Sequence, residues 1–119
     1  MTAQHLVGKY NVIGSNQDEE KNTYKGVLSL LIDSNSRIIA KWEINNSQIQ
    51  SGTGFFKNNI LVINFKYKGD ANITYKGVVV YQCLTPNILD GFWSEEFGNP
   101  SFLGEERCFR ITEKEESLN

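Results

Sequence analysis

Carboxylates are the side chains of this chain best suited to chemistry. Two acidic pairs, Glu95-Glu96 and Glu105-Glu106, lie in its last quarter. Acid–base catalysis needs two carboxylates in different environments that converge on one cleft. Neighbouring residues of a strand point to opposite faces, so at most one member of each pair can lie inside. Glu106 is the strongest candidate among these carboxylates. If Glu106 or Arg107 points inward, its buried charge needs a partner, and buried charges of this kind mark functional sites.

Other chemistry has few residues to support it. His5 is the single histidine and lies in an N-terminal segment that we expect to fray. Cys83 and Cys108 lack the spacing of a zinc site, and so sparse a pair predicts two buried free thiols. Gly52-Thr53-Gly54 lies inside an alternating strand instead of before a helix, which predicts a bulge or bend and no phosphate loop. No catalytic residue, metal or cofactor is therefore predicted.

Aromatic side chains are the strongest candidates for binding. Their rings bury a large area, and tyrosine and tryptophan add a polar group that can orient a ligand. The alternative is a packed core in which these rings contact one another. The predicted binding residues, around a small apolar or aromatic ligand, are Tyr10, Tyr24, Trp42, Tyr75, Tyr81, Trp93 and Glu106.

One phrase occurs twice at the same spacing. Thr23-Tyr24-Lys25-Gly26-Val27 precedes Trp42, and Thr74-Tyr75-Lys76-Gly77-Val78 precedes Trp93, with eighteen residues from tyrosine to tryptophan in both copies. The copies are offset by 51 residues. We therefore expect two hairpin-type repeats, around 23–44 and 74–95, within a single domain of residues 1–119.

Period-two alternation of apolar and polar residues recurs along the chain, with turn clusters of Asn, Gly, Asp and Ser between the alternating runs. It predicts eight strands, at about 6–13, 24–33, 38–44, 48–56, 60–67, 73–84, 88–94 and 104–112. Short turns between consecutive strands indicate an antiparallel meander, and closure removes its exposed edges. The predicted fold is all-β, a single eight-stranded antiparallel up-and-down barrel; a flattened sandwich is the alternative. Residues 113–119 are expected to fray.

The repeated tyrosine, glycine and tryptophan fall on the predicted inner face in both copies. A glycine inside a barrel lets a ring approach closely, so we expect glycine and tryptophan to form a small–large pair. The outer face is more apolar than a solvated exterior needs, which suggests an interaction surface or a homo-oligomer. The outward apolar residues are Val27, Leu31, Ile39, Val78, Val80 and Phe92.

Length and charge narrow the classes of function. A chain of 119 residues suits one domain, and a net charge of −2 gives no basic footprint for nucleic acid. No apolar run approaches the ~18 residues that span a bilayer. Residues 1–5 show neither the basic nor the apolar region of a secretory signal, so a cytoplasmic location is expected.

The beginning of the chain resembles two groups of barrel proteins. Leu6-Val7-Gly8-Lys9-Tyr10, followed by Gly14-Ser15-Asn16, is similar to the first strand and turn of avidin-like barrels. It is also similar to the Gly-x-Trp start of lipocalins, with Tyr10 in place of the tryptophan. The lipocalin resemblance implies that Arg107 or Arg110 packs across that ring. The polar biotin ligands of avidin are matched at Asn16 alone, so biotin binding is not predicted.

A second resemblance rests on short segments spread over nearly the whole chain. They are Gly8–Asn16, Tyr24-Lys25-Gly26, Trp42, Gly52-Thr53-Gly54, Ile60-Leu61-Val62, Tyr81, Leu89–Trp93 and Gly104-Glu105-Glu106. In these segments the chain resembles a family of small, mostly uncharacterised bacterial β-barrel proteins, some labelled fibronectin-binding. Glu105 departs from the family pattern, which has threonine there. The resemblance implies an avidin- or lipocalin-like, calycin-type barrel, and the fibronectin label is not carried over as a function.

Three functions remain open from the sequence. The first is a non-enzymatic barrel that holds a small, partly apolar molecule beside Trp42 and Trp93. The second is a solid barrel whose outer face binds another protein or a second copy of the chain. The third is an isomerase or cyclase of the calycin-like kind, with Glu106 as a buried carboxylate beside tyrosines. We favour the first, and we rank the third last because no acid–base pair can be named.

Overall fold

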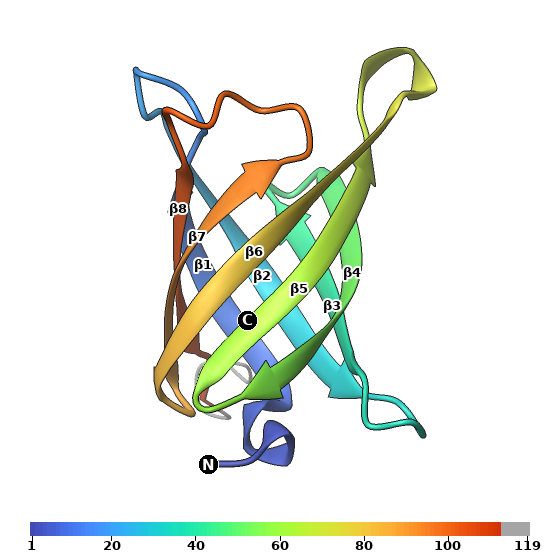
Figure 1. The fold of residues 1–119 in the computed structure, drawn as a ribbon, viewed down its shortest axis with the longest axis vertical. Helices are drawn as coiled ribbons and strands as arrows, with labels where there is room; N and C mark the ends of the chain where they lie inside the picture. The colour runs from blue at the N-terminus through green and yellow to red at the C-terminus, as the bar shows by residue number, and fades with distance from the viewer. Residues whose placement is uncertain (113–119) are drawn as a thin grey trace.

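The computed structural model describes residues 1–112 and shows a closed antiparallel barrel of eight strands (Figure 1). The strands follow one another round the barrel in chain order, and β8 pairs with β1 to close it. This confirms the predicted all-β, up-and-down barrel. The strands are β1 (Gly8–Ser15), β2 (Thr23–Ile32), β3 (Ile38–Ile44), β4 (Gln48–Lys57), β5 (Ile60–Lys68), β6 (Thr74–Thr85), β7 (Ile88–Glu95) and β8 (Gly104–Arg110).

The first strand begins later than predicted, because the preceding residues form a short 3-10 turn, η1 (Ala3–Leu6). Thr2 caps this turn: its backbone N–H donates to Nδ1 of His5 at 2.9 Å. Leu6 is fully buried. The expectation that the segment around His5 frays is therefore wrong. The predicted frayed tail, residues 113–119, lies outside the described residues.

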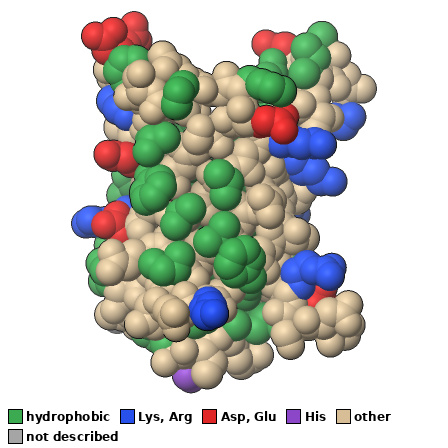
Figure 2. All heavy atoms as spheres, in the orientation of Figure 1, with side chains coloured by type: hydrophobic (Ala, Val, Ile, Leu, Met, Phe, Trp, Pro, Cys, Tyr) green, Lys and Arg blue, Asp and Glu red, His purple; other side chains and the backbone are tan. Residues whose placement is uncertain are grey.

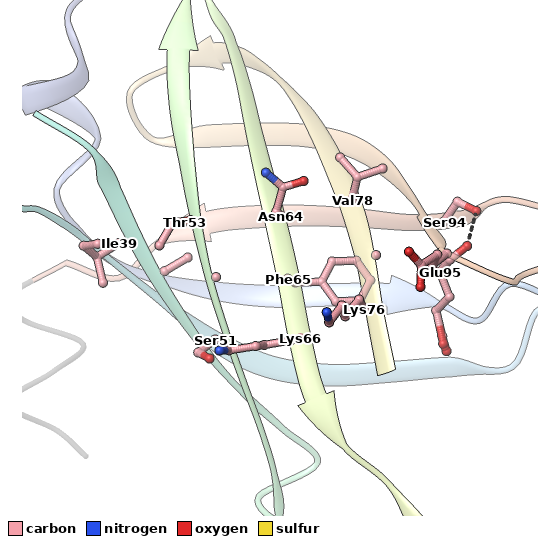
Figure 3. A pocket seen from close by; sticks show the side chains of 14 residues that line it. Ile39, Ser51, Thr53, Asn64, Phe65, Lys66, Lys76, Val78, Ser94 and Glu95 are labelled. Atoms are coloured by element: carbon pink, nitrogen blue, oxygen red, sulfur yellow. Dashed lines mark hydrogen bonds between the residues drawn. The ribbon is translucent and has the colours of Figure 1, made fainter. Parts of the chain in front are cut away.

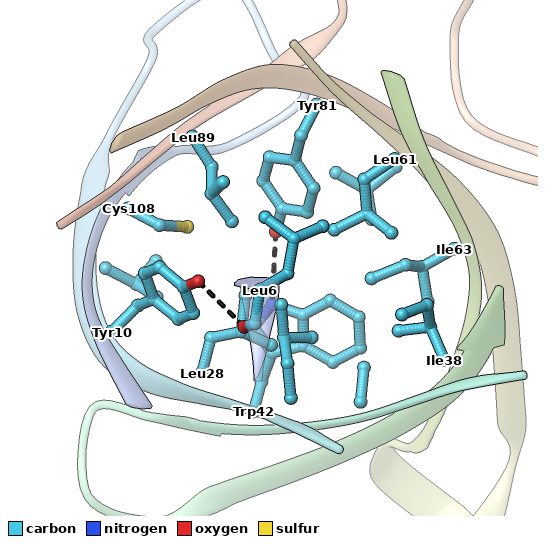
Figure 4. Packing of buried hydrophobic residues seen from close by; sticks show 14 of the residues in the cluster. Leu6, Tyr10, Leu28, Ile38, Trp42, Leu61, Ile63, Tyr81, Leu89 and Cys108 are labelled. Carbon is cyan, nitrogen blue, oxygen red and sulfur yellow. Dashed lines mark hydrogen bonds between the residues drawn. The ribbon is translucent and has the colours of Figure 1, made fainter. Parts of the chain in front are cut away.

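The two ends of the barrel differ. In Figure 1 the chain enters at the lower end, where η1 lies across the barrel, while the β1–β2, β3–β4, β5–β6 and β7–β8 connections lie at the upper end. Figure 4 shows Leu6 in the middle of a ring of core side chains that includes Tyr10, Leu28 and Leu89. The hydroxyl of Tyr10 donates to the backbone oxygen of Leu6 at 2.8 Å. Apolar burial and this hydrogen bond together close the lower end.

Arg110, at the end of β8, fastens η1 to the barrel. Its guanidinium carbon lies over the ring of Tyr10, 4.9 Å from the ring centroid. The lipocalin resemblance implied that Arg107 or Arg110 packs across this ring, and the structure shows that Arg110 does so. Arg107 is exposed and forms an ion pair with Asp90 at 3.2 Å. The guanidinium of Arg110 also donates, at 2.6–2.9 Å, to the backbone oxygens of His5, Val7 and Pro86.

The two copies of the repeated phrase form hairpins of identical register. Leu28 pairs with Trp42 in the β2–β3 hairpin, and Val79 pairs with Trp93 in the β6–β7 hairpin, so both members of the second pair lie 51 positions after the first. Strands β4 and β5 separate the hairpins on one side, and β8 and β1 on the other. The two tryptophans therefore point inward from opposite walls.

The glycines of β4 do not form the bulge that was one of the two predicted outcomes. The register of β4 with both neighbours runs unbroken through Gly52 and Gly54, so the expected bulge is absent there. A β-carbon at Gly54 would collide with the backbone oxygen of Val62 on β5. Glycine is thus needed for the close approach of β5. The pairing does shift between Cys83 and Thr85 on β6.

The outer wall carries many apolar side chains, as the alternation predicted. Leu31 is 59% exposed and Phe92 is 49% exposed. In Figure 2 hydrophobic side chains gather over the lower part of the face that β5 and β6 present in Figure 1. A second 3-10 turn, η2 (Asp70–Asn72), precedes β6. Within residues 1–112, neither η1 nor η2 has the length or apolar content of a membrane-spanning helix.

Candidate functional site

One hollow of the described chain is a shallow depression on the outer wall (Figure 3). It has a volume of about 840 Å³ and is lined by outward side chains of β3 to β7, among them Thr53, Asn64 and Val78. Lys66 and Lys76 extend along it without converging on a common point (Figure 3). Ligand sites are concave and combine apolar walls with convergent polar groups. This open depression lacks that combination.

A second cavity enters the barrel from its upper end and has a volume of about 230 Å³. Its walls are mainly aromatic, its mouth carries side-chain amides, and its one charged lining residue is Glu106. The wall includes Tyr24, Trp42, Phe65, Tyr67 and Trp93. The amides of the mouth come from Asn16, Asn45, Gln48 and Gln50. Aromatic walls combined with a small number of polar groups are the features of a small-molecule site.

Glu106 lies inside the barrel and is 6% exposed. The hydroxyl of Tyr24 donates to its Oε2 at 2.6 Å, and Nε1 of Trp42 donates to its Oε1 at 3.0 Å. The hydroxyl of Tyr81 also donates to Oε1, and Sγ of Cys108 lies 3.8 Å from the same oxygen. Four strands therefore direct donors at one carboxylate.

The alternation of β8 explains why Glu106 is the buried member of its pair. Gly104, Glu106 and Cys108 point inward and are buried, whereas Glu105 and Arg107 point outward and are exposed. Both cysteines of the chain, Cys83 and Cys108, are buried free thiols, as predicted. Within residues 1–112, no three His, Cys, Asp or Glu side chains gather in a way that could hold a metal ion.

Burial and hydrogen bonding act in opposite directions on Glu106. Loss of water raises the pKa of its carboxyl, and the donors Tyr24, Tyr81 and Trp42 favour the charged form and reduce that shift. Burial also raises the pKa of Tyr24, and the neighbouring Glu106 charge raises it further. The pKa of Tyr81 is likewise well above its usual value, chiefly because of burial. Both tyrosines therefore keep their protons and act as donors.

Two inner-face glycines make room for the rings of the cavity. Trp93 donates through Nε1 to the hydroxyl of Tyr24 at 3.0 Å. A β-carbon at Gly14 would collide with the ring of Tyr24, and one at Gly104 would collide with the indole of Trp93. Small residues on β1 and β8 thus hold the two rings in place.

The expected small–large pair of glycine and tryptophan exists, but its glycine is not the one in the repeat. Trp93 packs on Gly104 of β8. The repeat glycines are overlain by other side chains: Gly26 by Ile44 and Gly77 by Phe65.

Tyr75 does not join the cavity, although its repeat partner Tyr24 does. Tyr24 pairs across strands with Gly14, which leaves space for its ring to turn inward. Tyr75 pairs with Tyr67, and the two rings stack with centroids 5.3 Å apart. The ring of Tyr75 consequently lies at the rim and is 38% exposed. The identity of the cross-strand neighbour decides where each tyrosine goes.

The structure brings together five of the seven predicted site residues. Tyr10 lies at the closed end beneath Arg110, and Tyr75 lies at the rim. Tyr81 stands behind Glu106 as its hydrogen-bond donor. The five residues around the cavity and its carboxylate are Tyr24, Trp42, Tyr81, Trp93 and Glu106.

Two aromatic residues of β5 were missed from the sequence. Phe65 packs edge-on against both tryptophans, with centroids 6.3 Å from Trp42 and 6.1 Å from Trp93. The hydroxyl of Tyr67 donates to Oε1 of Glu95 at 2.7 Å. The signal was available, because Phe65 and Tyr67 continue the apolar alternation of the predicted strand 60–67.

Comparison with known proteins identifies the fold and no family. No protein-family model matches the chain, and no curated protein matches it, so the resemblance to the bacterial family gains no support. A redesigned β-barrel, b11L5F_LGL, is similar with a TM-score of 0.77 and 16% identity, over 93% of this chain and 96% of that one. A redesigned barrel bound to DFHBI, mFAP0, is similar with a TM-score of 0.65 and 20% identity, over 90% and 100%. Another, mFAP1 bound to DFHBI, has a TM-score of 0.63 and 21% identity, over 92% and 98%.

Proposed function

We propose that this barrel binds a small aromatic or partly apolar molecule in its upper cavity, without chemical turnover. The observation that carries the proposal is the arrangement of one buried carboxylate, Glu106, within an aromatic wall that opens at one end of the barrel. Aromatic walls supply apolar burial, and a single convergent polar group fixes the orientation of a ligand. The closed lower end limits access to one side.

The similar barrels that are bound to DFHBI give this proposal independent support. They share the closed-barrel architecture over nearly the full length of both chains. Their low identity to this chain means that the likeness concerns the fold, and their ligand enters here as a first probe. DFHBI is a small aromatic dye, which matches the aromatic wall of the cavity.

Tryptophan fluorescence tests the proposal directly, because Trp42 and Trp93 are the two tryptophans of the chain and both line the cavity. We expect a saturable change of their emission on titration with DFHBI or with phenethyl alcohol, and a matching heat by calorimetry. Absence of both signals with both probes would overturn the proposal.

A matched pair of variants locates the binding site. Gln50→Phe places a ring at the mouth and should weaken binding of the probes. Gln82→Phe adds the same ring to an exposed position of β6 and should leave binding unchanged. Equal effects of the two variants would place the binding outside the cavity.

A second candidate function is proton transfer by Glu106, favoured by its buried carboxyl with a raised pKa beside two tyrosines. Phenylacetone, a small aromatic ketone, serves as the probe. If Glu106 removes an α-proton, deuterium from heavy water should enter the bound ketone faster with the wild type than with Glu106→Gln. Equal exchange rates would dismiss this candidate and leave the binding proposal standing.

A further inference from the structure

We propose that the cavity selects cations, and that its ligands are small aromatic amines whose ammonium group pairs with Glu106. The inference rests on the proposed binding function and names the chemical class of its ligand. It is argued from the charges of the cavity, the free acceptor position on Glu106, the surrounding rings and the rim.

The charges of the cavity are one-sided. Glu106 is buried, and among residues 1–112 the groups that contact its carboxylate are uncharged: two hydroxyls, an indole N–H and a thiol. Lysine, arginine and histidine are absent from the lining of the cavity within the described chain. A buried charge is costly unless an opposite charge accompanies it. A cationic ligand would supply the missing charge.

The two carboxylate oxygens of Glu106 are occupied unequally. Within the described part of the chain, Oε1 receives Trp42, Tyr81 and the weaker contact from Cys108, whereas Oε2 receives Tyr24 alone. A carboxylate oxygen has two acceptor positions. Glu106 itself lines the cavity, so the spare position on Oε2 is the place where an N–H donor of a ligand would bind.

The wall suits the body of such a ligand. Trp42, Phe65 and Trp93 form a continuous set of edge-to-face rings in the same cavity lining as Glu106. The faces of aromatic rings attract cations, most strongly tryptophan and most of all where water is excluded. An aromatic amine would therefore place its ring among these side chains and its charge between them and Glu106.

The rim adds to the same preference. A hollow beside the mouth is lined by Asp18, Glu95 and Glu96, with Lys76 as the basic residue of that lining. Clefts of one sign raise the local concentration of ions of the opposite sign. The entrance therefore favours approach of a cation.

The competing class of ligand is a neutral or anionic hydrogen-bond acceptor. Such a ligand would need Glu106 in its protonated form, because only the protonated carboxyl can donate a hydrogen bond. Burial raises the pKa of Glu106, so the free carboxyl holds its proton more tightly than an exposed one. The titratable groups that face it, Tyr24 from β2, Tyr81 from β6 and Cys108 from β8, all have raised pKa values and stay neutral near pH 7. None of them supplies a positive charge, and a bound ammonium would lower the pKa of Glu106 again.

Three probes with one ring and different charges test the inference: phenethylamine, phenethyl alcohol and phenylacetate. Calorimetry and tryptophan fluorescence near pH 7 give their affinities. We expect the amine to bind at least about tenfold more tightly than the alcohol, with phenylacetate weakest. Equal affinities, or tighter binding of the alcohol or phenylacetate, would overturn the inference and leave the proposed function intact. Binding of none of the three would overturn the inference, and the proposed function would fall with it if DFHBI does not bind either.

Two variants assign the selectivity to one carboxylate. Glu106→Gln removes the inner charge and should reduce the preference for the amine to about twofold, while the affinity for the alcohol stays within about threefold. Glu105→Gln removes the same charge one residue away on the outer face and should keep the preference. Equal losses in both variants would show a general effect of net charge and overturn the inference. If Glu106→Gln does not fold, the order of the three probes on the wild type still decides.

Discussion

Glu106 is oriented by donors that cannot turn away from it. The indole N–H of Trp42 has no acceptor role, so it must donate. The hydroxyl of Tyr24 accepts a bond from Trp93, which leaves its own proton for Glu106. The carboxylate is thus held in one position before any ligand arrives, and such preorganisation reduces the entropy lost on binding.

This arrangement predicts that the donors around Glu106 need an acceptor at both of its oxygens. Glu106→Gln replaces one oxygen by an NH2 group that faces a donor and leaves a buried hydrogen bond unmade, so it should lower the free energy of unfolding by about 1–3 kcal/mol near pH 7. Chemical denaturation followed by circular dichroism measures it, with Glu105→Gln as the exposed control. An unchanged or raised free energy of unfolding in Glu106→Gln, or an equal loss in Glu105→Gln, would contradict this prediction.

The difference in stability between the wild type and Glu106→Gln should change with pH in one direction. The pKa of Glu106 is raised in the folded state, so the folded protein binds its proton more tightly than the unfolded chain does. The wild type should therefore gain stability relative to Glu106→Gln as the pH falls from neutral through that raised pKa, and the gain should stop near the unfolded value of about 4.3. A loss of relative stability on acidification would be the wrong sign.

Individual residues show where sequence reasoning succeeds and where it stops. Parity along one strand allows only one of Glu105 and Glu106 to lie inside, and the structure shows that it is Glu106. The different positions of Tyr24 and Tyr75 depend on their cross-strand neighbours, Gly14 and Tyr67. Those pairs depend on register, which no single strand contains. Five of the predicted residues therefore meet at the cavity, and Tyr75 does not.

At the scale of the elements, β8 supports the wall of the cavity through Gly104. A methyl group there collides with the indole of Trp93, a half-buried ring joined to Tyr24. We expect Gly104→Ala to cost about 1–3 kcal/mol of stability and to shift the emission of Trp93. Gly69→Ala is the matched control, because the ring of Tyr75 that it meets is partly exposed and can move into water. Equal costs of the two changes would refute this account.

The contact between η1 and β8 gives a second prediction at this scale. Arg110→Ala removes charged hydrogen bonds to the backbone oxygens of His5, Val7 and Pro86, and it also exposes the ring of Tyr10. It should lower the free energy of unfolding by about 2–3 kcal/mol. Arg107→Ala, which breaks an exposed ion pair with Asp90, should change it by less than about 0.5 kcal/mol. Urea denaturation of both variants distinguishes them, and similar losses would contradict the role of Arg110.

The sequence predicted the strands to within two residues, because alternation and turn residues are local signals. Asn58 and Asn59, for example, adopt positive φ angles of 51° and 64° in the tight β4–β5 turn, a conformation that asparagine tolerates. The turn η1 carried no such signal. A single 3-10 turn has no periodicity, and its partners Tyr10 and Arg110 lie on strands that are far apart in the chain.

At the scale of the whole molecule, closure of the barrel pairs every strand on both sides. No strand edge is therefore free among residues 1–112, so a contact with another protein cannot add a strand to this sheet. Association with another protein or with a second copy of the chain stays a prediction. It is supported by exposed apolar side chains of the outer wall, among them Leu31, Phe55 and Phe92. Light scattering at high concentration is the measurement that tests it: a monomer would count against self-association.

The last prediction is that side chains at the closed end of the barrel determine stability, whereas side chains at the open end determine ligand affinity. Leu6 fills the closed end and is fully buried, so Leu6→Ala should cost about 2–4 kcal/mol of stability. The cavity lies toward the other end and does not include Leu6 in its lining, so the affinity for phenethylamine should be unchanged in the folded variant. Gln50→Phe should show the reverse, with weaker binding and a stability change below about 1 kcal/mol. Thermal denaturation and calorimetry on both variants measure the two quantities, and a loss of affinity in Leu6→Ala would mean that the closed end and the cavity are coupled.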